Sequence, residues 1–145
     1  MQEKKVVNKG FDIKRIILLT FTFMTVGILF ELYLLEHFED SLQLIPIILI
    51  AIAMALFIVL QFKQTPVFFS IFKLSLIAIS LSGFYGVFLH LSGNFEFEQE
   101  MRPTAHSWDL FIESLSGAFP ALAPLNLIIL SLIGYTYLKL INQKK

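Results

Sequence analysis

The chain has 145 residues, of which 57% are hydrophobic and 15% are charged, and its formal net charge at pH 7 is zero. Soluble domains are about 45–50% apolar and about 25% charged, so this composition argues against a water-soluble globular protein, and the apolar content excludes intrinsic disorder. The absence of cysteine excludes disulfide bonds, iron–sulfur clusters and cysteine nucleophiles.

Four apolar stretches are long enough to cross a bilayer, since a spanning helix needs about 20 mainly apolar residues. They cover residues 16–35, 44–62, 67–91 and 118–141. We therefore predict an all-α integral membrane protein in which residues 1–145 form one domain, a bundle of four transmembrane helices. Lysines precede the first stretch, as in a signal peptide, but the stretch is too long, and Phe30, Glu31 and Tyr33 stand where a small-residue cleavage site is expected. We expect this helix to remain uncleaved.

Basic residues are sorted along the chain. All of them except Arg102 lie near the start of the first stretch, around the turn between the second and third, or near the end of the fourth. Because Lys and Arg concentrate in cytoplasmic loops, this pattern predicts cytoplasmic termini and an outer loop over residues 92–117. The excess of lysine over arginine and the many Phe and Ile residues suggest an AT-rich bacterial genome, so we expect a multi-pass protein of the inner (plasma) membrane.

The outer loop contains a turn signal, an alternating segment and a short amphipathic pattern. Residues 92–94 read Ser-Gly-Asn, which predicts the end of the third helix. Phenylalanine alternates with glutamate from residue 95 onward, which predicts an extended segment over 95–100 with its carboxylates on one side. Residues 103–116 are predicted to form a short helix that lies on the membrane surface. Its apolar face comprises Trp108, Phe111, Ile112 and Leu115.

Small residues in two of the predicted spans suggest a contact between ionisable side chains, since such residues mark close approach of membrane helices. Gly83 and Gly86 share one helical face with His90, at the outer end of the third span. In the first span, Gly27 precedes Glu31 by one turn in the same way. With both faces turned into the bundle, Glu31 and His90 approach each other just below the outer surface. An ionisable group at that depth is costly without a partner, which favours such a pair.

Histidines and carboxylates gather on the predicted outer face. Imidazole and carboxylate together suit divalent transition metals, so we predict a divalent metal site there. The candidate ligands are Glu31, His37, His90, Glu96, Glu98, Glu100 and His106. The sequence contains no compact ligand motif such as His-x-x-x-His, so two other interpretations stay open: a solvated acidic rim, and a proton-linked switch formed by Glu31 and His90.

The sequence favours a protein without enzymatic activity, since it contains neither a Gly-x-Ser-x-Gly motif nor a P-loop. We predict an accessory or binding subunit that presents its acidic, histidine-containing face outside the cytoplasm. Its expected contacts are the lipid bilayer and a membrane-protein partner or further copies of itself. A nucleic-acid partner is not expected, because the basic residues lie at the cytoplasmic edge of the membrane, where they favour anionic headgroups. Two alternatives stay open: an oligomeric ion or metal transporter subunit that uses Glu31 and His90, and a membrane enzyme or a haem or metal protein.

Overall fold

The structure is a computed structural model that describes residues 9–143 of the chain and the side chains of residues 13–143. The described residues form five helices: α1 (Lys9–Leu34), α2 (Ser41–Phe62), α3 (Pro66–Met101), α4 (Ser107–Ser114) and α5 (Leu125–Asn142). Four of these, α1, α2, α3 and α5, are long and apolar enough to cross a membrane. The prediction of an all-α fold with four helices of membrane-spanning length is therefore confirmed.

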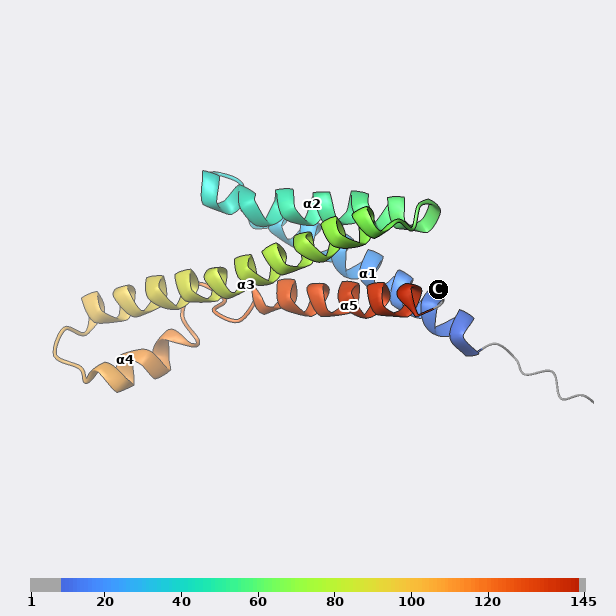
Figure 1. Cartoon of the computed structure of the whole chain (residues 1–145). Coiled ribbons are helices and arrows are strands. Elements are labelled where there is room, and N and C mark those ends of the chain that lie inside the picture. Colours follow the sequence, from blue (N-terminus) through green and yellow to red (C-terminus); the bar gives the residue numbers. More distant parts are fainter. Residues whose placement is uncertain (1–8, 144–145) are drawn as a thin grey trace, which may run out of the picture.

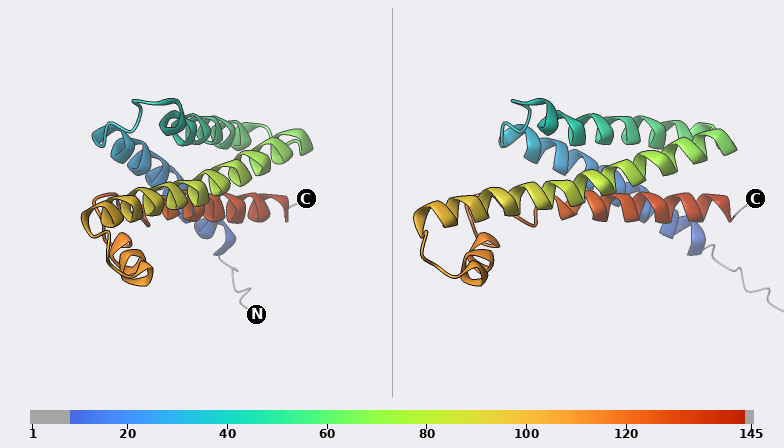
Figure 2. Two further views of the ribbon diagram at one scale, coloured as in Figure 1. Left: turned by 90° about the vertical axis from the view of Figure 1, so that its left-hand side faces the viewer. Right: turned by 60° about the vertical axis from the view of Figure 1, so that its left-hand side comes forward.

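The four long helices form one bundle in which successive long helices run in opposite directions (Figure 1). α3 packs mainly against α5 and α2, and α1 packs against the same two helices. At one end, which we call the lysine end, α1 and α3 begin and α2 and α5 end (Figure 1). The lysines with described side chains at this end are Lys14, Lys63, Lys73 and Lys139. At the opposite end, the lobe end, α4 packs beside α3, beyond the level at which α2 begins (Figures 1 and 2).

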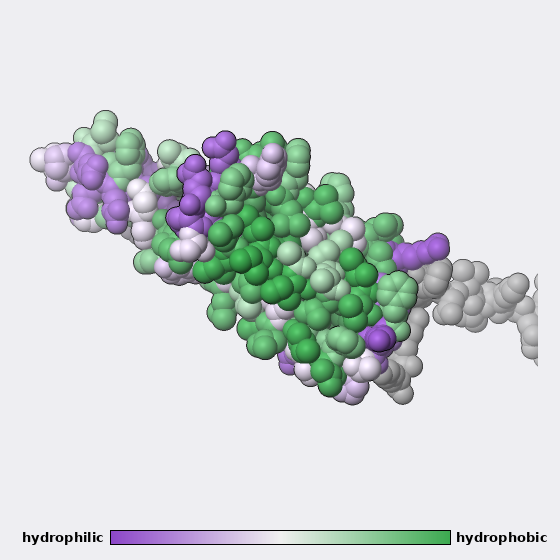
Figure 3. Space-filling model, turned by 90° about the horizontal axis from the view of Figure 1, so that it is seen from above, coloured by the Kyte–Doolittle hydropathy of each residue, from purple (hydrophilic) through white to green (hydrophobic). Residues whose placement is uncertain are grey.

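Hydrophobic side chains cover the long helices. Figure 3 shows a broad hydrophobic band across the middle of the molecule, with hydrophilic residues towards both ends. Many large apolar side chains of the long helices are more than half exposed, including those of Phe23, Leu81, Phe84 and Leu132. An apolar surface of this extent requires lipid or another apolar surface to cover it. The structure is therefore consistent with a multi-pass membrane protein in contact with the bilayer.

One aromatic residue from each long helix meets the others in the core. Phe21 of α1 stacks on Phe57 of α2 with ring centroids 4.2 Å apart, and Phe57 lies 4.7 Å from Tyr137 of α5. Phe72 of α3 lies 6.0 Å from both phenylalanines. The hydroxyl of Tyr137 donates to the side-chain oxygen of Gln61 at 2.8 Å, so this buried polar group has a partner. These contacts fill the interior of the bundle towards the lysine end.

Two glycines allow α3 to approach the start of α5 closely. A Cβ atom added at Gly83 would lie 2.9 Å from the carbonyl oxygen of Pro124, and one added at Gly86 would lie 2.9 Å from the Pro124 ring. The close contact expected at the small-residue face of α3 is therefore present. Gly27 of α1, by contrast, has no neighbouring atom within 4 Å of an added Cβ, so the expectation that its face points into the bundle is wrong.

α3 is longer than the sequence predicts. The turn predicted at residues 92–94 and the extended segment predicted over 95–100 are both wrong, because the helix continues to Met101. At a rise of about 1.5 Å per residue, its 36 residues span about 54 Å, whereas the hydrocarbon core of a bilayer is about 30 Å thick. Glutamate, glutamine and methionine are good helix formers, and they outweigh the alternating pattern. Roughly two fifths of α3 therefore extends beyond the length that the hydrocarbon core requires.

α5 begins at Leu125, later than the predicted residue 118. Pro124 stands at its N-cap, and Pro120 begins a turn in which the Ala123 N–H donates to the Pro120 carbonyl at 3.0 Å. A proline lacks the N–H that a helix interior needs but is tolerated at a helix start. The two prolines therefore delay the helix by about two turns, and the freed segment packs against α3.

Candidate functional site

The extension of α3, α4 and the flanking segments form a small lobe, which we define as residues 92–124 (Figures 1 and 2). α4 begins after His106, whose Nδ1 accepts the backbone N–H of Trp108 at 3.2 Å. Asp109 lies in the first turn, where a negative charge favours the helix N-terminus. Leu110 and Ser114 are the buried residues of α4, whereas the predicted apolar face is exposed, with Trp108 61% exposed. The predicted short helix is therefore present, and its position on a membrane surface stays a prediction.

The side chain of Asn94 joins α3 to the segment of the lobe that runs from the end of α4 to Phe119. Asn94 is only 2% exposed, and its amide nitrogen donates to the carbonyl oxygens of Ser114 (2.9 Å) and Phe119 (2.8 Å). Its amide oxygen accepts the backbone N–H of Phe119 at 2.9 Å. A Cβ atom added at Gly117 would lie 2.4 Å from Cγ of Asn94, so the loop can approach only because residue 117 is glycine. One asparagine thus holds both the end of α4 and the segment after it.

Arg102 joins the end of α3 to α4. Its guanidinium donates to Glu98 at 2.8 Å, one turn earlier in α3. It also donates twice to the carboxylate of Glu113 in α4, with one of these bonds at 2.8 Å. The pairing is bidentate but exposed, so it contributes to the geometry of the lobe more than to its stability. Glu98 and Glu113 are therefore engaged within the lobe.

An apolar groove of about 330 Å³ runs between the extension of α3 and α4. Its aromatic and aliphatic walls are Phe88, Leu91, Phe95 and Phe111, and its polar lining residues are Ser92, Glu96 and Ser114. Besides Phe111, the apolar side chains of Trp108 and Ile112 in α4 are exposed. An apolar groove on a hydrogen-bonded frame is a surface suited to receive an apolar side chain from another molecule.

A Schellman motif at the end of α1 positions His37. The backbone N–H of His37 donates to the carbonyl oxygen of Leu32 at 2.9 Å, and the N–H of Glu36 donates to that of Tyr33 at 3.1 Å. Glu36 adopts the left-handed conformation that this motif requires, with φ 52°. Glycine is the usual residue there, because a Cβ atom makes this conformation unfavourable. The motif holds the backbone so that the half-buried His37 ring contacts α3.

His37 and His90 form a pair at the lobe end, with ring centroids 6.4 Å apart in an edge-on arrangement. Nδ1 of His90 lies 3.1 Å from the carbonyl oxygen of Pro120, and because a carbonyl only accepts, this nitrogen carries the proton. Burial lowers the pKa of His37, the neighbouring His90 lowers it further, and Asp40 opposes both effects. His37 is therefore mainly neutral at pH 7.

The structure does not gather the seven predicted metal ligands at one point. Within residues 13–143, no three His, Asp or Glu side chains are grouped so that they could hold a metal ion. His37 and His90 come together, Glu98 pairs with Arg102, and His106 caps α4. The remaining candidates are exposed: Glu31, Glu96 and Glu100. This arrangement gives the metal site no support, and it stays a prediction.

The expected contact between Glu31 and His90 is not formed. Glu31 is exposed on α1, one turn after Gly27, which faces open space. The ion pairs of the described side chains both belong to Arg102, and neither involves Glu31 or His90. The argument from helical phase was wrong because α1 turns the Gly27 face away from α3. His37, beyond the end of α1, lies beside His90 instead.

Sequence reasoning missed the role of Asn94 and the groove. Asn94 was interpreted as part of a turn, although asparagine within an apolar stretch also marks side-chain hydrogen bonds between segments. Phe88 and Phe95 lie two turns apart on α3, so they share one face only if the helix continues past residue 92. The length of α3 therefore had to be known before the groove could be recognised.

Comparisons with protein-family models, with curated proteins and with solved structures find no match to this chain.

Proposed function

We propose that this chain is an accessory or binding subunit of the plasma membrane, and that its lobe receives the extramembrane part of a partner membrane protein. The observation that carries this proposal is the frame of the lobe, in which Asn94 and Arg102 hold α4 against α3 and leave an apolar groove between them. The aromatic core of the bundle is filled, which favours binding over transport through a single copy.

The chemistry of the groove defines the partner. Phe95 and Phe111 offer an apolar site, and exposed Trp108 adds an aromatic anchor of the kind that dominates protein interfaces. Glu96 and Glu100 are exposed carboxylates outside the ion pairs of Arg102. Complementary charge steers binding and selects the partner. We therefore infer a partner segment that carries an apolar side chain flanked by Lys or Arg.

The proposal includes an orientation of the chain in the membrane. The lysine end faces the cytoplasm, because cytoplasmic segments of membrane proteins are rich in Lys and Arg. Both termini are then cytoplasmic, and the lobe lies on the outer side of the membrane. α4 lies at the outer interface, with exposed Trp108 at the level where aromatic side chains are favoured. The partner must therefore present its segment close to the outer surface.

Site-specific photocrosslinking in native membranes tests this function. A photoreactive phenylalanine analogue at Phe111 samples the groove, and the same analogue at Phe84, exposed on the spanning part of α3, is the matched control. We expect a discrete protein adduct from position 111 that is absent from position 84. The charge reversals Glu96→Lys and Glu100→Lys should weaken the adduct, and mass spectrometry should identify a membrane protein with a basic segment at the crosslink.

Other outcomes would overturn the proposal. Lipid adducts alone at position 111 would assign the groove to the bilayer. An adduct with a second copy of the chain would make the lobe a homo-oligomer contact. An adduct that survives both charge reversals would contradict the inferred partner chemistry.

A further inference from the structure

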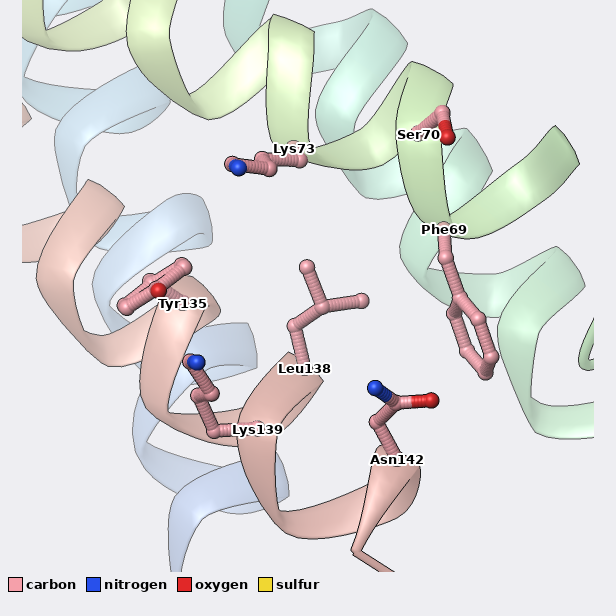
Figure 4. Close-up of a pocket in the computed structure, with 7 residues that line it drawn as sticks. All are labelled: Phe69, Ser70, Lys73, Tyr135, Leu138, Lys139 and Asn142. Carbon is pink, nitrogen blue, oxygen red and sulfur yellow. The ribbon is translucent and has the colours of Figure 1, made fainter. Parts of the chain in front are cut away.

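A second concave site lies at the lysine end, between the start of α3 and the end of α5 (Figure 4). It is a cleft of about 190 Å³. Its lining residues include Ser70 and Lys73 of α3 and Tyr135, Leu138, Lys139 and Asn142 of α5. The cleft is remote from the lobe, and the proposed binding function makes no use of it.

Two ammonium groups reach this cleft from facing helices. Figure 4 shows Lys73 extending from α3 and Lys139 rising from α5 on the same side of the opening, with Leu138 between the helices. Lys139 lies over the ring of Tyr135, with its Nζ 5.5 Å from the ring centroid. Neither lysine is in an ion pair with a described carboxylate, since both such pairs belong to Arg102 at the lobe end. Among the described side chains, therefore, no carboxylate compensates the positive charge of this cleft.

The other lining groups favour an anion with an apolar part. The side-chain amide of Asn142 supplies a neutral donor to the cleft. The hydroxyl of Ser70 donates to the carbonyl oxygen of Pro66 at 3.0 Å, so it supplies no donor to an anion. Leu138 and Tyr135 present apolar surface beside these groups. A phosphate group with a glycerol and acyl chain attached matches both the positive charge of the cleft and its apolar surface.

The position of the cleft along the helices points to the same ligand. Lys73 lies about two turns into α3, and Lys139 lies in the last turn of α5. Lys139 therefore sits near the end of the apolar part of α5. Lys73 lies inside the apolar part of α3, which starts at Val67, but a lysine side chain is long enough to carry its ammonium group toward the headgroups. Basic pockets between membrane helices on the cytoplasmic side bind anionic headgroups. We infer that this cleft binds the phosphate group of an anionic phospholipid, with Lys73 and Lys139 as its charge partners.

Lipid titration of the purified full chain in mild detergent, followed by native mass spectrometry, tests the inference. Phosphatidylglycerol is the probe, phosphatidylcholine is the neutral-headgroup control, and inorganic phosphate tests whether a soluble anion suffices. We expect bound phosphatidylglycerol, much weaker binding of phosphatidylcholine, and no competition by inorganic phosphate. Each lysine removed should weaken phosphatidylglycerol binding about fivefold, and the double variant Lys73→Gln/Lys139→Gln about 30-fold.

Matched variants separate the cleft from general surface charge. Lys63 caps the C-terminus of α2 at the same end but does not line the cleft, so Lys63→Gln should leave the affinity unchanged. The variant Lys73→Arg/Lys139→Arg keeps both charges and should keep binding, which shows that the site tolerates substitution. Equal losses in Lys63→Gln and in the glutamine double variant would overturn the inference. Equal binding of phosphatidylcholine, or displacement by inorganic phosphate, would overturn the lipid assignment.

Discussion

Removing the side chain of Asn94 is expected to loosen the lobe without unfolding the bundle. The variant Asn94→Ala loses three hydrogen bonds, two to Phe119 and one to Ser114. At about 1 kcal/mol net for each bond, the loss is about 3 kcal/mol. Partner groups left without a bond raise this value and water that enters the space lowers it, which gives a range of about 2–4 kcal/mol. Because these bonds join α3 to residues 114 and 119, the variant should lower the free energy needed to open α4 and the segment after it away from α3.

Hydrogen–deuterium exchange of the chain in nanodiscs measures this opening. A loss of about 3 kcal/mol corresponds to roughly 100-fold faster exchange of amides in residues 107–124, because local opening governs their exchange. Amides of α2 and of the second half of α5 should keep their protection. Gln99→Ala, at an exposed position on the same extension of α3, is the matched control and should exchange like the wild type. Unchanged exchange in Asn94→Ala, or faster exchange throughout the bundle, would refute the assignment of Asn94 as the residue that holds the lobe.

Two further predictions concern the turn after α1. Glu36→Gly is expected to raise the melting temperature, because glycine adopts φ 52° without the unfavourable energy of about 1–2 kcal/mol that a Cβ atom brings. Thermal unfolding in detergent measures this, and the control variant Glu39→Gly should show no gain. A lower melting temperature for Glu36→Gly would contradict the explanation. The lowered pKa of His37 means that the unfolded chain takes up a proton near the ordinary value of about 6.5 while the folded chain does so only at lower pH. The contribution of neutral His37 to the stability of the folded chain is therefore complete above this pH and is lost as the pH falls below it. The melting temperature of the wild type should then decline more steeply with acid than that of His37→Gln. Parallel declines would show that the folded and unfolded chains bind this proton equally.

The number of long helices and the sorting of charge were predictable because each depends on local composition. Apolar runs of sufficient length define membrane-spanning helices regardless of how they pack. A close helix contact at Gly83 and Gly86 was predictable for a similar reason, since the two glycines share a face at helical spacing, but its partner α5 was not predicted. These features needed no knowledge of which segments meet.

The lobe could not be predicted, because it depends on contacts between distant segments. Residues 92–100 carry a turn signal and an alternating pattern, yet they are helical, and Asn94 within this helix bonds to residues 114 and 119. Gly93 likewise admits the ring of Phe119, which lies 3.1 Å from an added Cβ. The partner of His90 was missed for a related reason, since the left-handed conformation of Glu36 has no glycine or asparagine to signal it.

α3 connects the two proposed sites rigidly. Lys73 lines the cleft at the lysine end, and Phe95 lines the groove in the lobe. At about 1.5 Å per residue, the two positions lie about 33 Å apart along one continuous helix, close to the thickness of about 30 Å for a hydrocarbon core. When a lipid phosphate holds Lys73 at one headgroup region, a separation of this size brings Phe95 to the opposite interface. Lipid bound in the cleft would therefore set the height at which the groove meets its partner.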